Sequence, residues 1–212
     1  MKIKHVWFDL EGTLTVRSEE FNKAHDSLRY SAYASATKQE VSNDLQVEYE
    51  TLYSQYGSNS ATFRSLGLPS DYWQNQFAAL DVEKYYRPVP EITETLDQLR
   101  GVVPISMFTN LKHDEIDRIL EIIGINKEWF TSIISGDDVL ERKPSLNGFK
   151  KMVEVCNLEP QQLMYVGDRI KVDILPAREL GIKTYLVFSE SDQADFSSMH
   201  FKDILTLFVD PK

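Results

Sequence analysis

Four short motifs, spread over most of the chain, carry carboxylate, hydroxyl and basic side chains, and three of them stand at the ends of short apolar runs. They are Asp9-Leu10-Glu11-Gly12-Thr13-Leu14-Thr15, Phe108-Thr109-Asn110, Arg142-Lys143-Pro144 and Gly167-Asp168-Arg169-Ile170-Lys171-Val172-Asp173. In the first motif one carboxylate can attack while the other transfers a proton, and Gly12 permits the chain reversal that turns both toward one site. An acidic strand end followed by a glycine turn is the alternative interpretation.

The second and third motifs offer groups that bind anions. The Thr109 hydroxyl and the adjacent backbone amides at Asn110 can hold phosphoryl oxygens, although Thr-Asn is also ordinary turn chemistry. Lys143 stands beside the start of a helix, where an ammonium can screen an attacking carboxylate from a phosphate. A merely solvated lysine is the alternative.

The fourth motif carries two carboxylates that can hold a hard cation. Asp168 lies at a strand end and Asp173 early in the next helix, so they can bind an ion directly or through its waters. Helix capping is the competing explanation for Asp173. The chain has one cysteine and four scattered histidines, so metal chemistry should use oxygen ligands.

The elements that must position these residues alternate between strand and helix. Short apolar runs predict buried strands, and the segments between the later ones have helical spacing. The strands are expected at Ile3–Phe8, Val102–Phe108, Thr131–Ile134, Leu163–Val166 and Thr184–Phe188, and the helices at Glu91–Leu99, Glu115–Ile123, Leu146–Val155 and Ile174–Leu180. This rhythm predicts an α/β fold with a Rossmann-like, doubly wound parallel sheet, in which Asp9, Thr109 and Asp168 converge at one edge.

One stretch breaks the alternation. Between about Ser18 and Tyr86 the sequence has helical periodicity and no strand-like run. The simplest interpretation is an α-helical subdomain, residues 17–87, inserted after the first strand. Residues 1–16 and 88–212 would then form the sheet domain.

Composition limits the classes of partner. The chain has 212 residues, 42% of them hydrophobic, and a formal charge of -10. An acidic protein is not attracted over distance to nucleic acid or to an anionic membrane, and no apolar stretch approaches the roughly 20 residues that span a bilayer. We therefore expect a cytoplasmic enzyme with neither nucleic acid nor membrane as partner. The oligomeric state is left open.

Taken together, the four motifs resemble the haloacid dehalogenase superfamily, whose pattern is D-x-[DE]-G-T-x-T, Ser or Thr at a strand end, K-P, and G-D-x-x-x-x-D. The resemblance covers nearly the whole chain. The insert is similar to the helical cap of the subgroup whose cap follows the first motif. The resemblance implies a phosphatase that uses Mg²⁺ and an aspartyl-phosphate intermediate to hydrolyse a small phosphorylated metabolite.

The resemblance also implies roles for single residues. Asp9 would be the nucleophile and a magnesium ligand, and Glu11 would be the general acid and base that also offers its backbone carbonyl to the metal. Thr109 and Asn110 would bind the substrate phosphate together with Lys143, which also orients Asp9.

The remaining implied roles concern the metal. Asp168 would be a ligand of the ion, and Asp173 would support Lys143 or the metal-bound waters. Most phosphatases of the family carry Asp at the position of Glu11, but enolase-phosphatases resemble this chain in having D-x-E-G-T. Dehalogenating members generally lack a carboxylate there, so Glu11 argues against dehalogenation.

Three questions stay open at this point. A phosphomutase on the same scaffold and a non-catalytic binding protein with this fold are the alternatives to a phosphatase. The substrate is a second question, with a nucleotide and a sugar phosphate both open. The third concerns the insert, whose tyrosines and Trp73 resemble the aromatic residues of pyrimidine nucleotidase relatives. These side chains would either stack on a base or pack in a helical core.

Overall fold

The computed structural model describes residues 2–208. The chain divides into two compact units, Met1–Val16 with Tyr86–Lys212 (the sheet unit) and Arg17–Tyr85 (the helical unit). The first junction coincides with the sequence-based boundary after residue 16, and the second lies two residues before the sequence-based boundary after residue 87. Within residues 2–208, no helix has the length and apolar content needed to cross a membrane.

The sheet unit contains six parallel strands in the order β3-β2-β1-β4-β5-β6. The strands are β1 (His5–Phe8), β2 (Ile105–Phe108), β3 (Phe130–Ile134), β4 (Leu163–Gly167), β5 (Lys183–Val187) and β6 (Phe196–Ser198). Strand order reverses between β1 and β4, so this is a doubly wound sheet with its switch point there. The predicted α/β class and parallel sheet are confirmed.

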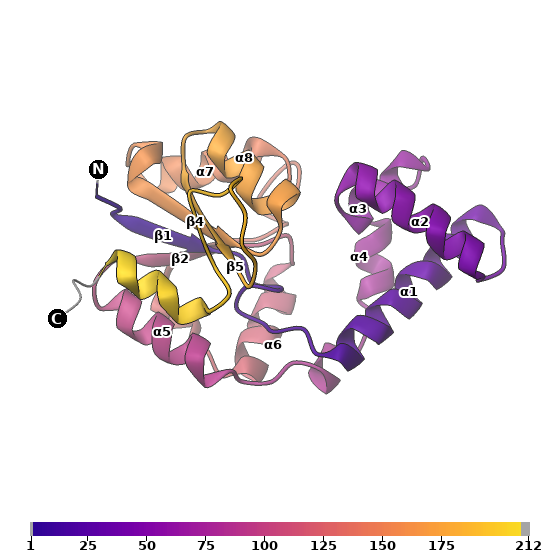
Figure 1. Cartoon of the computed structure of the whole chain (residues 1–212), viewed down its shortest axis with the longest axis horizontal. Helices are drawn as coiled ribbons and strands as arrows, with labels where there is room; N and C mark the ends of the chain where they lie inside the picture. Colours follow the sequence, from indigo (N-terminus) through magenta and orange to yellow (C-terminus); the bar gives the residue numbers. More distant parts are fainter. Residues whose placement is uncertain (1, 209–212) are drawn as a thin grey trace. The chain divides into compact units, whose positions relative to one another are not determined.

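Helices cover both faces of the sheet (Figure 1). They are α5 (Pro90–Arg100), α6 (His113–Ile123), α7 (Leu146–Cys156) and α8 (Leu175–Glu179). Because successive side chains of a strand point to opposite faces, Trp7 packs with Phe149 of α7 and Ala177 of α8, whereas Phe8 contacts Phe201 on the other face. All of these side chains are buried, which anchors β1 at the centre of the core.

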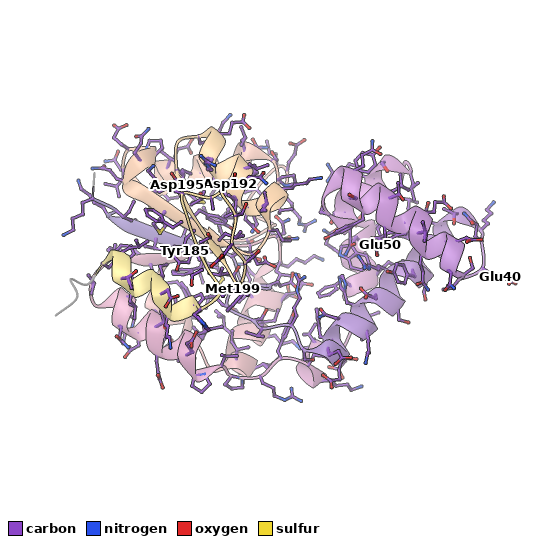
Figure 2. All side chains as sticks on the ribbon, viewed as in Figure 1. Glu40, Glu50, Tyr185, Asp192, Asp195 and Met199 are labelled. Carbon is purple, nitrogen blue, oxygen red and sulfur yellow. The ribbon has the colours of Figure 1, made fainter. Side chains whose placement is uncertain are left out.

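The sixth strand was not predicted. β6 has only three residues, and no alternation of apolar side chains marks it in the sequence. Hydrogen bonds from β5 hold the residue that precedes β6. The Asp195 carboxylate accepts from Lys183 Nζ (2.8 Å) and from the Thr184 amide and hydroxyl (both 3.0 Å). Asp195 is labelled in Figure 2. These hydrogen bonds fix the chain just before β6.

The helical unit consists of α1 (Glu19–Thr37), α2 (Asn43–Tyr56), α3 (Asn59–Ser65) and α4 (Tyr72–Phe77). Serine caps the first three helices: the hydroxyls of Ser18, Ser42 and Ser58 each accept a hydrogen bond from a backbone amide in the first turn. These caps explain why the helices begin where they do.

Aromatic rings fill the interior of the helical unit. Tyr49 and Phe63 are fully buried, Trp73 is nearly so, and Phe63 stacks against Trp73 with ring centroids 5.7 Å apart. Arg29 lies over the Tyr49 ring and pairs with Glu50, which is labelled in Figure 2. Tyr49 and Trp73 therefore form the core of this unit, which is the packing role that the sequence left as the alternative to binding a base.

Candidate active site

The site lies at the carboxyl ends of three adjacent strands. β1 pairs with β2 on one side and with β4 on the other, with Phe8 opposite Met107 and Val166. The residues that follow these strands, Asp9, Thr109 and Asp168, therefore emerge at the same edge of the sheet. The backbone amide of Asp9 donates to Val166 O (2.9 Å), which fixes the first carboxylate next to the end of β4.

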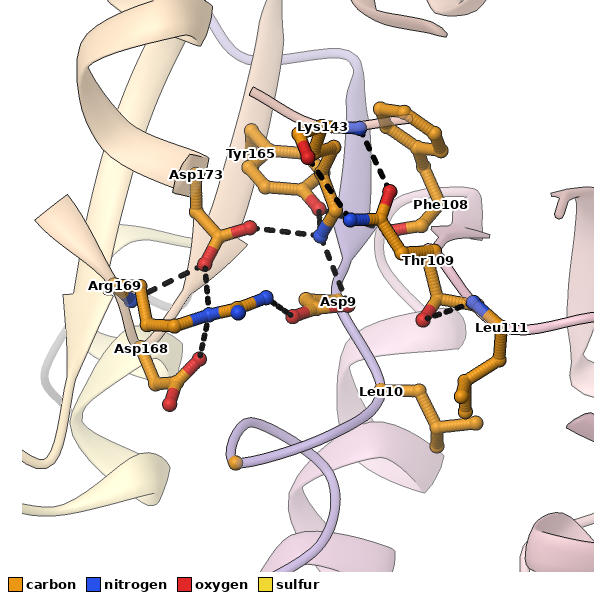
Figure 3. A network of polar contacts seen from close by, with 12 residues as sticks. Asp9, Leu10, Phe108, Thr109, Leu111, Lys143, Tyr165, Asp168, Arg169 and Asp173 are labelled. Carbon is orange, nitrogen blue, oxygen red and sulfur yellow. Dashed lines mark hydrogen bonds and ion pairs between the residues drawn. The ribbon is translucent and has the colours of Figure 1, made fainter. Parts of the chain in front are cut away.

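A buried lysine lies at the centre of the site (Figure 3). Lys143 Nζ lies 2.9 Å from Asp9 Oδ1 and 2.7 Å from Asp173 Oδ1, and it donates to the Tyr165 hydroxyl at 2.7 Å. An ammonium has three hydrogens, so each one has an acceptor here. Since the Lys143 side chain is 0% exposed, these contacts compensate the cost of removing its charge from water.

Tyr165 connects Lys143 to the backbone of β2. Its hydroxyl accepts from Lys143 and donates to Phe108 O (2.8 Å). Burial raises the pKa of Tyr165 well above its usual value, and the nearby carboxylates of Asp9 and Asp173 raise it further. The hydroxyl therefore keeps its proton and acts as a fixed donor to the carbonyl.

Asp9 is a buried carboxylate that stays ionised. Burial alone would raise its pKa, but the charges of Lys143 and Arg169 outweigh this effect and hold the pKa below its ordinary value. Asp9 Oδ1 is engaged by Lys143, whereas Oδ2 is buried and accepts no hydrogen bond, its nearest cation being Arg169 Nη2 at 3.6 Å. An ionised oxygen without a hydrogen bond is suited to attack an electrophile or to bind a cation.

Three carboxylates gather beside this lysine. Oxygens of Asp9, Asp168 and Asp173 all lie within 4.8 Å of one another. A π-helical turn at Ile170–Ile174 brings Asp173 back toward the strand end, and its carboxylate accepts the Arg169 backbone amide (3.1 Å). A site of carboxylate oxygens favours hard cations such as Mg²⁺.

Asn110 positions Lys143. Its side-chain amide accepts a hydrogen bond from the Lys143 backbone amide (2.7 Å) and donates to the Lys143 carbonyl (3.0 Å). Thr109, one residue earlier, is buried, and its amide donates to Ile134 O (3.1 Å). The second motif therefore holds the loop that carries the lysine, while its predicted contact with a phosphate stays a prediction.

Glu11 has a partner in the segment that re-enters the sheet unit. The Tyr86 hydroxyl donates to Glu11 Oε1 at 3.2 Å, and Tyr86 is buried. Directly after Glu11 the chain turns, and Gly12 has a φ of +80°. The turn thus places Glu11 at the same end of the sheet as Asp9, with its carboxylate held by a phenol.

The sequence interpretation did not name Tyr86, Tyr165 or Arg169 as site residues. Tyr165 carried a signal, since a hydroxyl within the apolar strand Leu163–Gly167 needs a partner when it is buried. Tyr86 carried none, because its contact joins residues 75 positions apart. Arg169 lies between Asp168 and Asp173 in the fourth motif, but its approach to Asp9 depends on how distant segments come together. The predicted residues Asp9, Lys143, Asp168 and Asp173 do come together through direct contacts or close approach.

Comparison with known proteins gives the site a family context. The model of the haloacid dehalogenase-like hydrolases matches residues 3–181. The chain is 28% identical to a glyceraldehyde 3-phosphate phosphatase of Pyrococcus abyssi over 86% of this chain and 80% of the relative. It is 27% identical to a phosphoglycolate phosphatase of Escherichia coli (strain K12) over 84% and 79%.

Solved structures share the fold. A putative phosphoglycolate phosphatase from Lactobacillus plantarum superposes with a TM-score of 0.72, with 20% identity over 98% of this chain and 100% of that one. A putative hydrolase from Bacillus subtilis, described as bound to magnesium, superposes with a TM-score of 0.65, with 13% identity over 98% and 99%.

Proposed function

The chain belongs to the haloacid dehalogenase-like hydrolases, and from the geometry of its site we propose that it is a magnesium-dependent phosphatase of small phosphorylated metabolites. The observation that carries the proposal is the state of Asp9. Its carboxylate is buried and ionised, Lys143 holds Oδ1, and Oδ2 accepts no hydrogen bond. Such an oxygen is a preorganised nucleophile.

The residues present fit a magnesium ion. The candidate ligands are carboxylate oxygens from Asp9, Asp168 and Asp173, which lie within 4.8 Å of one another, and Asp9 Oδ2 has no hydrogen bond to lose. When bound, magnesium would neutralise charge on the phosphoryl oxygens. The solved relative from Bacillus subtilis that is described as bound to magnesium supports this choice of ion.

In the first step, we infer, Asp9 attacks the phosphorus atom in line with the ester oxygen. A bond forms between an Asp9 carboxylate oxygen and phosphorus while the bond from phosphorus to the alcohol oxygen breaks. Protonated Glu11 gives its proton to the departing alkoxide, which leaves as the alcohol. Lys143, held by Asp173 and Tyr165, keeps the carboxylate oriented for the attack.

In the second step water attacks the same phosphorus atom. Glu11, now ionised, takes a proton from the water, the bond between Asp9 and phosphorus breaks, and inorganic phosphate is released. Both enzyme groups return to their starting states. Thr109 and the Asn110 backbone amide hold phosphoryl oxygens in this proposal, and the Asn110 side chain keeps Lys143 in place.

The proposal extends to the substrate and to the helical unit. The two relatives compared above are named for phosphoglycolate and glyceraldehyde 3-phosphate, so we infer a small phosphorylated metabolite of this kind. Inserted directly after the first motif, residues 17–85 are assigned the role of a cap. A cap that excludes bulk water would strengthen the electrostatic interactions of the reaction.

The test compares Asp9→Asn with Asp97→Asn. Asp97 lies on α5 and is exposed, so its substitution makes the same charge change away from the site. Phosphate release from a panel that includes phosphoglycolate, glyceraldehyde 3-phosphate and p-nitrophenyl phosphate is measured with magnesium and without a bisphosphate activator. We expect Asp9→Asn to lose turnover about a thousand-fold or more and Asp97→Asn to keep it.

Two controls make the result interpretable. Circular dichroism and urea unfolding check that Asp9→Asn keeps the fold, and a chelator followed by added magnesium checks that turnover depends on the ion. Unchanged turnover in folded Asp9→Asn would remove Asp9 from the mechanism. Wild-type turnover that survives chelation would remove magnesium from the proposal.

A further inference from the structure

Arg169 lies within the site but has no role in the steps of the proposed reaction. Its guanidinium lies among the three carboxylates of the acidic cluster: Nη2 is 3.6 Å from Asp9 Oδ2, and Nε is 3.6 Å from both Asp168 Oδ1 and Asp173 Oδ2. Figure 3 shows the side chain lying between these carboxylates. The guanidinium is thus close to one oxygen of every candidate metal ligand.

A cation bound by these oxygens would need them closer together. Oxygens bonded to one magnesium ion lie 2.0–2.1 Å from it, so any two of them are at most about 4.2 Å apart. The oxygens of the cluster lie within 4.8 Å of one another. A modest contraction of the cluster therefore suffices. The oxygens that would move together include those that lie 3.6 Å from the Arg169 guanidinium.

The charges explain why the guanidinium belongs there. Asp9, Asp168 and Asp173 are three carboxylates in a largely buried site, and Lys143 compensates only part of their charge. Arg169 supplies a second positive charge, and it contributes to the low pKa of Asp9. Like-charged carboxylates at this separation repel strongly when burial lowers the local dielectric.

The Arg169 side chain can leave while its backbone stays. The Arg169 amide donates to Asp173 Oδ2 (3.1 Å) and its carbonyl accepts from the Asp173 amide (2.9 Å), so the turn is fixed independently of the guanidinium. The side chain is 28% exposed, which gives it a route to solvent without disturbing the core. Its withdrawal would free the same oxygens that a cation needs.

We propose that Arg169 is an internal competitor of the divalent cation, whose guanidinium neutralises the acidic cluster and must give up its carboxylate contacts when the ion binds. The inference rests on the metal site of the proposed function. Arg169 thereby sets the cation affinity: it lowers the affinity for Mg²⁺ and stabilises the cluster at low Mg²⁺ concentration.

The experiment measures Mg²⁺ binding and stability in three variants and the wild type. Arg169→Gln removes the charge, Arg169→Lys keeps it without the fork that reaches several carboxylates, and Lys171→Gln makes the same charge change at an exposed position two residues along. Chelator-treated proteins are titrated with MgCl₂ by calorimetry at fixed ionic strength. Thermal unfolding is followed in chelator and in excess MgCl₂.

We expect Arg169→Gln to bind Mg²⁺ about ten-fold more tightly than the wild type because one competing positive charge is gone. Its unfolding midpoint in chelator should fall, and the rise on adding MgCl₂ should exceed that of the wild type. Arg169→Lys should fall between the two, and Lys171→Gln should change the affinity less than two-fold.

Other outcomes separate this inference from the proposed function. Mg²⁺ binding by Arg169→Gln that is only as strong as that of the wild type would overturn the competitor role. Weaker binding would also overturn it and would show that Arg169 supports the ligands instead. An equal gain in Lys171→Gln would also overturn it, because the effect would then be general charge. Absence of Mg²⁺ binding in all four folded proteins would overturn the proposed metal site together with this inference.

Discussion

At the scale of single residues, the site departs from its family at Glu11. The common residue there is Asp, and the additional methylene of Glu extends the carboxylate farther from the backbone. In this protein the longer side chain reaches the Tyr86 hydroxyl, which donates to Oε1 at 3.2 Å. The contact fixes the direction of the carboxylate, so Tyr86 compensates for the freedom that the longer side chain adds.

The substitution Glu11→Gln tests proton transfer at this position. Gln keeps the shape and an oxygen that can accept from Tyr86, but it cannot give a proton to a leaving alkoxide. We expect turnover of an alkyl phosphate such as phosphoglycolate to fall about a hundred-fold or more, and that of p-nitrophenyl phosphate to fall much less, because p-nitrophenolate needs little protonation. Steady-state rates for both substrates give the measurement.

The comparison with Glu11→Asp completes this test. Asp restores the residue common in the family and keeps a proton donor, so the selective loss on alkyl phosphates should disappear. Equal losses for both substrates in Glu11→Gln would argue against proton donation by Glu11 and would point to a positioning role.

At the scale of the elements, the loop after β1 rests directly on the end of β4. A Cβ placed on Gly12 would lie 2.2 Å from Asp168 Oδ2, and the Gly12 φ of +80° is itself unfavourable for other residues. Similarly, a Cβ on Gly167 would meet the Asp173 Cβ at 2.4 Å. Two glycines therefore let the loop, the strand end and the π-helical turn come close enough to bring their carboxylates together.

Gly12→Ala should lower both stability and magnesium affinity, because Asp168 has to move away from the new methyl group. Gly67→Ala is the matched control: Gly67 also has a φ of +80°, but nothing lies within 4 Å of its would-be Cβ. We expect backbone strain of about 1–2 kcal/mol in both variants and an additional loss only in Gly12→Ala. Urea unfolding and Mg²⁺ titration measure the two effects, and equal behaviour of the variants would contradict the clash with Asp168.

The strands that carry the site residues could be predicted from the sequence. The strands that precede Asp9, Thr109 and Asp168 are short apolar runs, and the parallel order of such runs brings their ends to one edge. Two expected strands begin too early: β1 starts at His5 rather than Ile3, and β2 starts at Ile105 rather than Val102. In the second case Val102 is 54% exposed, so an apolar residue there does not mark a buried strand.

Contacts between distant segments could not be predicted. The two hydrogen bonds between the Asn110 side chain and the Lys143 backbone join residues 33 positions apart, and the contact between Tyr86 and Glu11 joins residues 75 positions apart. Asn110 fits ordinary turn chemistry equally well in sequence, and only the fold brings the Lys143 backbone within reach of its amide. Residue types and spacing therefore locate a site, whereas the partners that orient its side chains depend on tertiary packing.

At the scale of the whole molecule, a buried polar connection joins three strands of the sheet. His5 of β1 is 7% exposed, and its Nε2 lies 2.8 Å from Ser106 Oγ of β2, which also accepts the Ser132 amide of β3 (3.1 Å). Because Ser106 Oγ accepts from Ser132, its own hydrogen is available to Nε2. Burial lowers the pKa of His5 from 6.5 to about 4, so the ring is neutral in the folded protein near pH 7.

This depressed pKa predicts how stability falls in acid. Between pH 6.5 and 4 the unfolded chain binds a proton at His5 that the folded protein does not, so the free energy of unfolding decreases as the pH falls through this range. From pH 7 to pH 5 the loss should be about 2 kcal/mol. The lowered pKa of Asp195 acts in a different window, since its stabilising effect is present above about pH 4 and is lost only below it.

Urea unfolding of wild type, His5→Gln and His200→Gln at pH 7 and pH 5 tests this assignment. His5→Gln removes the ring that stacks on Trp7, so we expect a lower free energy of unfolding at pH 7. The further decrease in this free energy between pH 7 and pH 5 should be about 2 kcal/mol smaller than in the wild type. His200→Gln is the matched control, since it makes the same replacement at an exposed position. If His5→Gln loses as much stability between the two pH values as the wild type, the acid sensitivity of the sheet arises from other groups, and the connection from β1 to β3 is only a packing feature.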